Sequence, residues 1–524
     1  MKVLVADKLN KAGVEALQAE VEVDVKTGLT PEELKSIIGE YDGLVVRSDT
    51  KVTAEIIEAG KNLRVVGRAG VGVDNIDLNA ATQHGIIVVN APTSNTTSAA
   101  EHAFGLMLAL ARHIPQAHYS LKGGLWERSN YVGIELKGKC LGVVGLGNVG
   151  SEISRRALAF EMRVLGYDPF VSSEYAKKLG VELVAVDKLL KESDFITLHI
   201  PSTADTKGLI GEKELAMMKP SVRIINCARG GLINEDLLVK SIEGGKIAGA
   251  AIDVFSKEPA TENVLLQSEK IIVTPHLGAS TAEAQAGVAI DIAEEILSVL
   301  KGQPARYTVN APKIPAEVMS TLAPFMDVAS TLGSIARQLM EGQIKRIHIT
   351  YNGEIASQDA TVLNSLIIGG LLEGMSEERV NLVNASIITA QRGIKVVEQK
   401  EITCENYANM ITLEVTTNSG TTTVAGTVLR GETHIVRVND FWLDIIPTGG
   451  YFLFCDHNDR PGLIGAVGMI TGKVDINISS MQLARLQPRG HALMILALDE
   501  PIPGKQLDEV LALPDVNNAK LVKL

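Results

Sequence analysis

The chain is poor in cysteine, and the few that it has follow no metal-binding pattern. Its 524 residues contain four cysteines, at positions 140, 227, 404 and 455, and no two of them have Cys-x-x-Cys spacing. Neither a zinc site nor a disulfide framework is indicated, and we expect no metal. Reduced thiols are typical of the cytosol, so we expect a cytoplasmic protein.

Long apolar runs and an excess of positive charge are also missing. The longest apolar stretch noticed, residues 103–111, is too short to cross a bilayer, and the N-terminus begins as a strand without a signal-peptide core. The net charge is −12 and the pI is near 5.5. This balance disfavours a nucleic acid or an acidic membrane as partner, although a local basic cluster can still bind an anionic substrate.

A glycine-rich turn stands out in what is present. Residues 140–145 form a strand-like apolar run, and Gly145-Leu-Gly147-Asn-Val-Gly150 leads from it into a helical stretch at 151–160. Glycines in this order allow a tight turn, close approach of a pyrophosphate and close packing of helix on strand. The amides at the start of the helix favour the negative phosphates. The pattern predicts a dinucleotide-binding turn.

An acidic residue strengthens this interpretation. Asp168 ends a second strand-like run, at 162–167, and lies 18 residues after Gly150. A carboxylate there can accept hydrogen bonds from the adenosine ribose and would repel a 2′-phosphate, so we expect NAD rather than NADP. The alternative is an ordinary glycine turn with a surface acid.

Three further polar residues, Arg229, Glu258 and His276, each follow a strand-like run of the same region. Because parallel strands end at one edge of a sheet, we expect the three side chains to meet at a cleft. A guanidinium suits a carboxylate, an imidazole can exchange a proton near pH 7, and a carboxylate can orient the imidazole. Singly, each residue could be structural; together they indicate oxidation or reduction of a 2-hydroxy or 2-oxo acid.

The chain resembles the D-isomer-specific 2-hydroxyacid dehydrogenases in segments 145–150, 226–231, 253–259 and 274–280. The resemblance implies that Arg229 holds the substrate carboxylate and carbonyl, that His276 is the acid/base and that Glu258 is its partner. It implies the following cofactor contacts: Gly145, Gly147, Asn148, Val149, Gly150, Asp168, Cys227, Ala228, Arg229, Asp253, His276, Gly278 and Ala279. Some relatives have threonine where this chain has Val71, which puts a side-chain contact to the cofactor there in doubt.

Within that family the chain is most similar to the long-form members that oxidise D-3-phosphoglycerate to 3-phosphohydroxypyruvate in serine biosynthesis. We expect Arg47 and Arg68, with Ser48 and Gly70, on the substrate side, because a 3-phosphate needs positive donors. The alternative for each arginine is a surface ion pair. A reductase of glyoxylate, hydroxypyruvate or 2-oxoglutarate, or a non-catalytic dinucleotide-sensing scaffold, remains open as the function.

The expected fold is α/β with added α+β domains. Residues 1–97 and 283–310 would form a discontinuous flavodoxin-like substrate domain, and residues 98–282 a Rossmann NAD-binding domain. Residues 97–121 read as one long helix and 281–300 as a second, while Pro304, Pro312 and Pro315 mark a linker. An intervening regulatory domain would cover 316–446, and a regulatory module 450–524.

The last module has the order strand, helix, strand, strand, helix, strand and resembles an ACT domain, an amino-acid-sensing unit. The resemblance implies L-serine as effector, held by His457, Asp459 and Asn477. A plain dimerisation sheet is the alternative for this module. We expect a homo-oligomer, a dimer or a tetramer, because such modules pair edge to edge.

Overall fold

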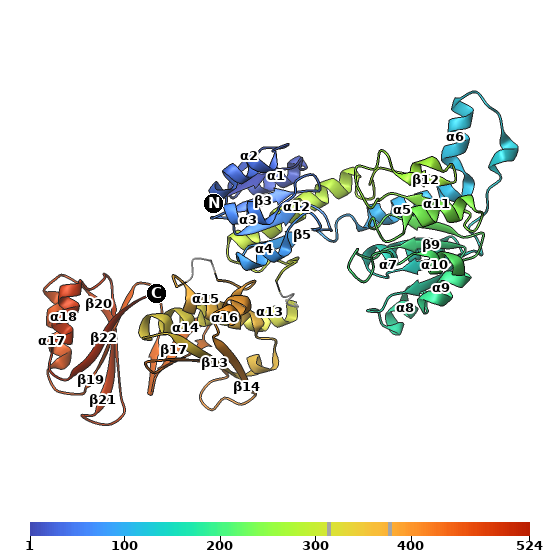
Figure 1. Cartoon of the computed structure of the whole chain (residues 1–524). Coiled ribbons are helices and arrows are strands. Elements are labelled where there is room, and N and C mark those ends of the chain that lie inside the picture. The colour runs from blue at the N-terminus through green and yellow to red at the C-terminus, as the bar shows by residue number, and fades with distance from the viewer. Residues whose placement is uncertain (312–315, 376–379) are drawn as a thin grey trace.

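The computed structural model describes residues 1–311, 316–375 and 380–524. Its four β-sheets are spread along an elongated molecule in which the N-terminal sheet lies between the seven-stranded sheet and the two C-terminal sheets (Figure 1). Pro312 and Pro315 of the predicted linker lie outside the described residues. Among the described helices, none combines the length and the hydropathy needed to cross a membrane. The α/β class with parallel sheets and a strand-rich C-terminal half is as predicted.

The first lobe is a five-stranded parallel sheet in the order β2-β1-β3-β4-β5, the flavodoxin-like order. Its elements are β1 (Lys2–Val5), α1 (Lys11–Gln18), β2 (Glu22–Val25), α2 (Pro31–Ile37), β3 (Gly43–Val46), α3 (Ala54–Ala59), β4 (Val65–Arg68), α4 (Leu78–Gln83), β5 (Ile87–Asn90) and, from later in the chain, α12 (Ala282–Leu300).

Both faces of this sheet are buried, which explains its continuous apolar strands. One set of alternate strand residues, including Leu4 and Val66, packs on α2, α3 and α4. The other set, including Val3 and Val65, packs on α1 and α12. Thr281 caps α12 by accepting from the amide of Ala284, so that this return helix begins within one residue of its predicted start.

The second lobe is a seven-stranded parallel sheet in the order β12-β11-β10-β9-β6-β7-β8, a Rossmann order with one added strand. Its strands are β6 (Cys140–Val144), β7 (Arg163–Tyr167), β8 (Glu182–Leu183), β9 (Phe195–Leu198), β10 (Arg223–Asn226), β11 (Gly249–Ile252) and β12 (Ile271–Val273). Its helices are α5 (Thr96–Arg112), α6 (Ile114–Lys122), α7 (Asn148–Ala159), α8 (Ser173–Leu179), α9 (Val186–Glu192), α10 (Glu212–Met217) and α11 (Glu235–Glu243).

The single long helix expected at 97–121 is wrong, because two helices occupy this segment. His113 takes a left-handed conformation (φ 54°) between α5 and α6, and Pro115 stands at the start of α6. Proline fits the first turn of a helix but breaks the interior of one, so Pro115 is the signal for the break. As a result α6 leaves the lobe and projects outward (Figure 1).

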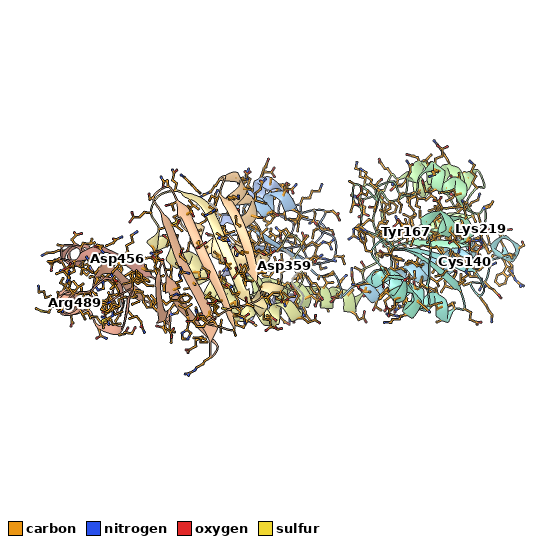
Figure 2. All side chains as sticks on the ribbon, turned by 90° about the horizontal axis from the view of Figure 1, so that it is seen from below. Cys140, Tyr167, Lys219, Asp359, Asp456 and Arg489 are labelled. Atoms are coloured by element: carbon orange, nitrogen blue, oxygen red, sulfur yellow. The ribbon has the colours of Figure 1, made fainter. Side chains whose placement is uncertain are left out.

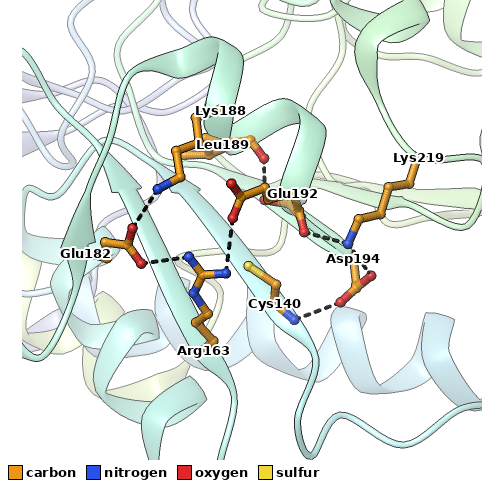
Figure 3. Close-up of polar contacts among 9 residues, drawn as sticks. Cys140, Arg163, Glu182, Lys188, Leu189, Glu192, Asp194 and Lys219 are labelled. Carbon is orange, nitrogen blue, oxygen red and sulfur yellow. Dashed lines mark hydrogen bonds and ion pairs between the residues drawn. The ribbon is translucent and has the colours of Figure 1, made fainter.

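A network of ion pairs connects the amino-terminal ends of the strands in this lobe (Figure 3). Arg163 at the start of β7 pairs with Glu182 at 2.7 Å and Glu192 at 3.0 Å, and Lys219 pairs with Asp194 at 2.9 Å. Bonds to Lys188 and Arg163 lower the pKa of Glu182 to about 2. The contacts join elements separated by 19 to 29 residues in sequence. They therefore organise the edge of the sheet opposite the strand ends that carry the predicted site.

The third lobe has a six-stranded sheet with helices on one face. Its elements are α13 (Ala316–Leu322), α14 (Met326–Leu339), β13 (Ile344–Gly353), α15 (Thr361–Leu372), α16 (Ala385–Gln391), β14 (Lys395–Glu401), β15 (Asn409–Thr417), β16 (Thr421–Leu429), β17 (Glu432–Val438) and β18 (Phe441–Ile445). The strand order is β14-β13-β15-β16-β17-β18. Of the neighbouring pairs described in this sheet, β13–β14 is parallel and the others are antiparallel.

The fourth module has the predicted βαββαβ order. Its elements are β19 (Tyr451–Asn458), α17 (Leu463–Gly472), β20 (Ile478–Arg485), β21 (His491–Leu498), α18 (Gly504–Leu511) and β22 (Val516–Lys523), in the sheet order β20-β21-β19-β22. Along β19, Leu453 and Cys455 face α17 and α18, whereas Phe452 and Phe454 join the core of the third lobe. The third lobe and the fourth module thus share one apolar core, although the sequence divides them at residues 447–450.

Candidate active site

The predicted site residues lie at the carboxyl ends of the strands in both parallel sheets. Figure 2 shows Tyr167, the last residue of β7, on the side of the second lobe that faces the rest of the chain, whereas Cys140 and Lys219 lie on its far side. The strand order of the second sheet reverses between β6 and β9, where open α/β sheets bind ligands. The site is therefore assembled where the two lobes meet.

The glycine turn lies between β6 and α7 and is shaped for close approach. Gly145 has φ 93°, a conformation that favours glycine, and a Cβ on Gly150 would overlap the carbonyl oxygen of Gly145. A Cβ on Gly147 would meet nothing within 4 Å, so this face of the turn is open. Because α7 begins at Asn148 without a side-chain cap, its first amides are free for phosphate oxygens. The turn fits a dinucleotide.

Asp168 directly follows β7 and is held by the glycine turn itself. Its Oδ2 accepts from the amide of Leu146 at 2.8 Å, and its Oδ1 accepts from the amide of Phe170 at 2.9 Å. The two bonds fix the carboxylate beside the turn, where ribose hydroxyls of a bound dinucleotide would reach it. The arrangement fits the predicted preference for NAD.

His276 and Glu258 are brought together from the loops after β12 and β11. His276 Nδ1 lies 2.9 Å from Glu258 Oε2, and the other carboxylate oxygen of Glu258 accepts from the amide of Phe255 at 3.1 Å. The pair lines a cavity of about 680 Å³ to which Ser48, Asp49 and Lys51 of the first lobe also contribute. Because Nδ1 is engaged by Glu258, the Nε2 atom is the one left for a substrate.

Asp253 follows β11 and positions the loop that carries His276. Its carboxylate accepts from Thr274 Oγ1 at 2.6 Å and from the amides of Leu277 and Gly278 at 2.7 and 2.9 Å. His276 has φ 55°, and its amide donates to the Asp253 carbonyl at 2.9 Å. The buried Asp253 thus stabilises a left-handed conformation that a non-glycine residue rarely adopts.

His102 on α5 lies against the same carboxylate, with Nε2 3.2 Å from Asp253 Oδ1. Burial raises the pKa of Asp253, but bonds from His102, Thr274 and Leu277 outweigh it and hold this pKa below its ordinary value. Burial and Asp253 raise the pKa of the Cys227 thiol well above its usual range. His102, Cys227 and Asp253 form a group close enough for a metal ion, but hydrogen bonds within the protein already engage the Asp253 carboxylate.

Three arginines lie near one another where the lobes meet, two from the first lobe and one from the second. Arg68 ends β4, Arg47 follows β3 and Arg229 follows β10. Burial and the neighbouring charges of Arg229 and Arg47 lower the pKa of Arg68 to about 10, and within the described chain its buried Nε has no hydrogen-bond partner. The charges of Asp74 and Asp7 oppose this shift in pKa but do not cancel it, so the cluster keeps an excess of positive charge. This cluster is suited to an anion.

Glycines make room for two of these guanidiniums. A Cβ on Gly70 would overlap Nη1 of Arg68, and a Cβ on Gly72 would lie 2.5 Å from Nη2 of Arg229. Both arginines therefore pack against the backbone of the 70–72 turn. Val71, between the two glycines, has no hydroxyl, so it cannot make the side-chain hydrogen bond to the cofactor that a threonine could make.

The loop that carries Arg47 and Ser48 is fixed from both sides. Buried Asp7, just after β1, accepts from the amides of Arg47 and Thr50 at 2.5 and 3.2 Å. Asn75 Nδ2 donates to the carbonyls of Arg47 and Thr50 at 2.7 and 2.6 Å. The loop is thus held in place before any substrate arrives.

The predicted effector residues do not meet within one chain. His457 is buried in β19, and Asp459, just beyond it, pairs with Arg485 at 3.0 Å. Asn477 precedes β20 and donates to Asp499 at 2.8 Å. The β20–β21 register places Asn477 near Leu498, whereas Asp459 lies near the start of β21. These ends are about 23 Å apart at roughly 3.3 Å per residue.

Our sequence reasoning missed several residues that build the site: Asp7, Asp74, Asn75, His102 and His199. Asp7 and His199 had a readable signal, because each is a polar residue at the carboxyl end of a buried parallel strand. His199 is partly buried beside Thr197, and its desolvation lowers its pKa to about 4. His102 gave no signal of its own, because it lies within a helix and follows no strand.

Curated relatives match this chain over its whole length. The D-3-phosphoglycerate dehydrogenase of a Synechocystis species is 47% identical and is matched over 95% of its length. That of Archaeoglobus fulgidus is 44% identical and that of Bacillus subtilis 42%, matched over 100% and 99% of their lengths. In each case all of this chain is covered. The chain belongs to the D-3-phosphoglycerate dehydrogenase family.

Family models divide the chain in agreement with this membership. Residues 104–278 match the NAD binding domain of D-isomer specific 2-hydroxyacid dehydrogenases, and residues 321–439 match the D-3-phosphoglycerate dehydrogenase intervening domain. The second lobe therefore binds NAD, and the protein is an NAD-dependent dehydrogenase.

Solved structures cover the two catalytic lobes. A glyoxylate reductase from Paecilomyes thermophila is 31% identical with a TM-score of 0.55, and covers 59% of this chain and 98% of its own. The D-lactate dehydrogenase of Escherichia coli is 27% identical with a TM-score of 0.53, with coverages of 59% and 100%. The family's two-lobe fold thus serves several 2-oxo acids, and substrate choice depends on the site.

Proposed function

We propose that this enzyme oxidises D-3-phosphoglycerate to 3-phosphohydroxypyruvate with reduction of NAD, the step that commits carbon to serine. The relatives that match over their full length are named D-3-phosphoglycerate dehydrogenases. The match to the intervening domain distinguishes the chain from the shorter members of the wider family. The convergence of Arg47, Arg68 and Arg229 in one cleft carries the proposal.

The proposed roles follow from the geometry of the loops. Arg229 holds the substrate carboxylate and the oxygen on C2, because its planar fork of donors matches both. His276 Nε2 accepts the proton of the C2 hydroxyl, while Glu258 holds Nδ1 and stabilises the imidazolium that forms. NAD, when bound, accepts the hydride from C2. Asp168 and the amides of the glycine turn hold the ribose and the pyrophosphate.

Arg47 and Arg68 are left for the 3-phosphate. The phosphate dianion relieves the repulsion among the arginines, so its binding is favoured by the same charges that lower the pKa of Arg68. A phosphate-free 2-hydroxy acid gains nothing from them. The proposal thus predicts strong discrimination for the phosphorylated substrate.

Initial rates of NAD reduction across 2-hydroxy acids with and without a 3-phosphate test the assignment. Arg47→Ala and Arg68→Ala should each raise KM for 3-phosphoglycerate about tenfold or more and leave a phosphate-free substrate unaffected, since charge-assisted bonds contribute about 1.5–3 kcal/mol each. Equal effects on both substrates would assign the two arginines a structural role. His276→Ala should remove most turnover and retain NADH binding.

Two other functions were open from the sequence. A reductase of another 2-oxo acid would use the same Arg229, Glu258 and His276, and the substrate panel separates it from our proposal. A non-catalytic dinucleotide-sensing scaffold has no use for a paired acid/base, so the 2.9 Å contact of His276 with Glu258 weighs against it.

We further propose that the fourth module is an ACT domain that binds L-serine between two copies of the chain. Asp459 and Asn477 lie at opposite ends of one module, so a single ligand reaches both only if a second copy supplies one of them. Asp459 must also release Arg485 to take the ammonium. Calorimetry with L-serine on the full chain should show binding that Asp459→Ala and Asn477→Ala abolish, with D-serine as control; wild-type affinity in both variants would refute this site.

The enzyme is proposed to be a cytoplasmic homo-oligomer, a dimer or a tetramer. Its four cysteines are free, as in a reducing compartment. The projecting α6 and the segment after it expose a row of large apolar side chains, which supports an interface: Ile114, Tyr119, Leu121, Leu125, Trp126 and Val132. Trp126→Asp should lower the mass measured by light scattering, whereas Phe170→Asp, an isolated exposed aromatic on the same lobe, should not.

A further inference from the structure

Asp74, an acidic residue of the first lobe, forms an ion pair with Arg229. Asp74 Oδ2 lies 3.6 Å from Arg229 Nε, and the Asp74 side chain is 74% exposed. The two residues come from different lobes, since Arg229 follows β10 and Asp74 lies between β4 and α4. This ion pair therefore joins the two lobes across the cleft.

The local packing shows that the contact is built into the loop. A Cβ on Gly72 would come within 2.5 Å of Arg229 Nη2 and 2.8 Å of Asp74 Oδ2, so the absence of a side chain at Gly72 leaves room for both members of the ion pair. The neighbouring Asn75 is fixed by its bonds to the carbonyls of Arg47 and Thr50. Asp74 is thus presented to Arg229 by a loop whose next residue is anchored.

We propose that Asp74 competes with the substrate carboxylate: it pairs with Arg229 and must leave it when a 2-hydroxy acid binds. The inference rests on the proposed role of Arg229 as the holder of the substrate carboxylate. A carboxylate on a guanidinium is the same chemical contact whether the protein or the substrate supplies it. Only one of the two can use the Nε side of Arg229 at a time.

The competition makes binding less favourable by whatever the ion pair contributes. An exposed ion pair contributes little, so the competition should weaken substrate binding by a factor of only about two to five. In return, Asp74 keeps the arginine cluster partly neutralised, and its charge opposes the burial and the like charges that lower the pKa of Arg68. The carboxylate of any 2-hydroxy acid replaces the single charge of Asp74, and a substrate with a 3-phosphate brings further negative charge for Arg47 and Arg68.

Asp74→Asn tests the competition, because it keeps the size of the side chain and removes its charge. We expect KM for 3-phosphoglycerate to fall about two- to fivefold with kcat unchanged, and the inhibition constant of oxalate, an inert dicarboxylate, to fall by the same factor. The dissociation constant of NADH should not move. Asp74→Glu, which restores a carboxylate, should return both values to those of the wild type.

Glu55→Gln is the matched control. Glu55 in the same lobe pairs with Lys35 at 3.8 Å, is 76% exposed and lies outside the cleft, so it removes the same charge from a similar ion pair. It should leave KM unchanged. A KM and an oxalate constant that stay constant or rise in Asp74→Asn would overturn the proposal, because Asp74 would then assist the substrate. If the wild type does not oxidise 3-phosphoglycerate, the proposed function fails, and oxalate binding in the presence of NADH still decides the role of Asp74.

Discussion

Replacing Gly72 with alanine isolates the position of Arg229 from its chemistry. The φ angle of Gly72 lies outside the left-handed region, so its backbone accepts alanine without strain. The new Cβ would lie 2.5 Å from Arg229 Nη2 and 3.1 Å from its Cζ, whereas ordinary contact begins at 3.4 Å. The guanidinium must therefore retreat by 3.4 − 2.5 = 0.9 Å, and Asp74 Oδ2, which the Cβ would approach to 2.8 Å, must shift as well, while every functional group of the site is retained.

A displacement of about 1 Å at a substrate-positioning group can cost up to about a hundredfold in rate. We expect kcat/KM for 3-phosphoglycerate to fall about ten- to a hundredfold in Gly72→Ala, with the NADH dissociation constant within twofold of the wild type. The midpoint of thermal unfolding should not fall, because Arg229 moves into an open cleft and alanine lowers the entropy of the unfolded chain.

Steady-state kinetics with NADH fluorescence titration measure both quantities. Gly105→Ala is the control: a Cβ there meets nothing within 4 Å, and the residue lies within α5. The reasoning is refuted if Gly72→Ala keeps kcat/KM within twofold of the wild type, because Arg229 would then tolerate the shift and could not be the group that orients the substrate.

Three further predictions concern the second lobe. Desolvation lowers the pKa of His199 to about 4, so the unfolded chain binds more protons than the folded protein below pH 6.5, and stability falls as the pH falls there. His199→Gln should remove about 2 kcal/mol of the stability lost between pH 7 and pH 5, measured by urea unfolding of both proteins, and an equal loss in both would contradict the assignment. Asp168→Ala should weaken NAD about tenfold and narrow its preference over NADP, because the ribose acceptor and the repulsion of a 2′-phosphate disappear together, and an unchanged ratio of kcat/KM values would count against it. Glu258→Gln should lower kcat about ten- to a hundredfold with NADH binding retained, and unaltered turnover would show that the carboxylate does not support His276.

Several residues proposed for catalysis or for holding the cofactor could be predicted because each follows a buried strand. Arg229, Asp253 and His276 follow β10, β11 and β12, and parallel strands bring their carboxyl ends to one edge whatever the intervening sequence. That reasoning needs only strand positions. It also places Asp168 beside the glycine turn.

The remainder depended on contacts that sequence spacing does not carry. The Asp74–Arg229 pair joins residues 155 positions apart in two lobes, and their mutual placement depends on how the lobes close. The separation of Asp459 from Asn477 depends on strand register, which their positions in the sequence leave undetermined. By contrast, the break at His113 was readable, since Pro115 two residues later disfavours a continuous helix.

The core shared by the third lobe and the fourth module bears on how the C-terminal region can be studied. Phe452, Phe454, Leu493, Ile495 and Val522 cover one face of the ACT-like sheet and are buried against the neighbouring lobe. A fragment that starts at residue 450 would turn this face to water as one aromatic and aliphatic patch, which promotes aggregation.

The segment 446–450 therefore joins two parts of a single folding unit. A protease nick there would leave two pieces held together by their common interior, and they would be expected to elute as one species. Effector measurements on an excised module would be made on an aggregation-prone fragment. The shortest fragment of this half of the protein that keeps the shared core intact comprises residues 316–524.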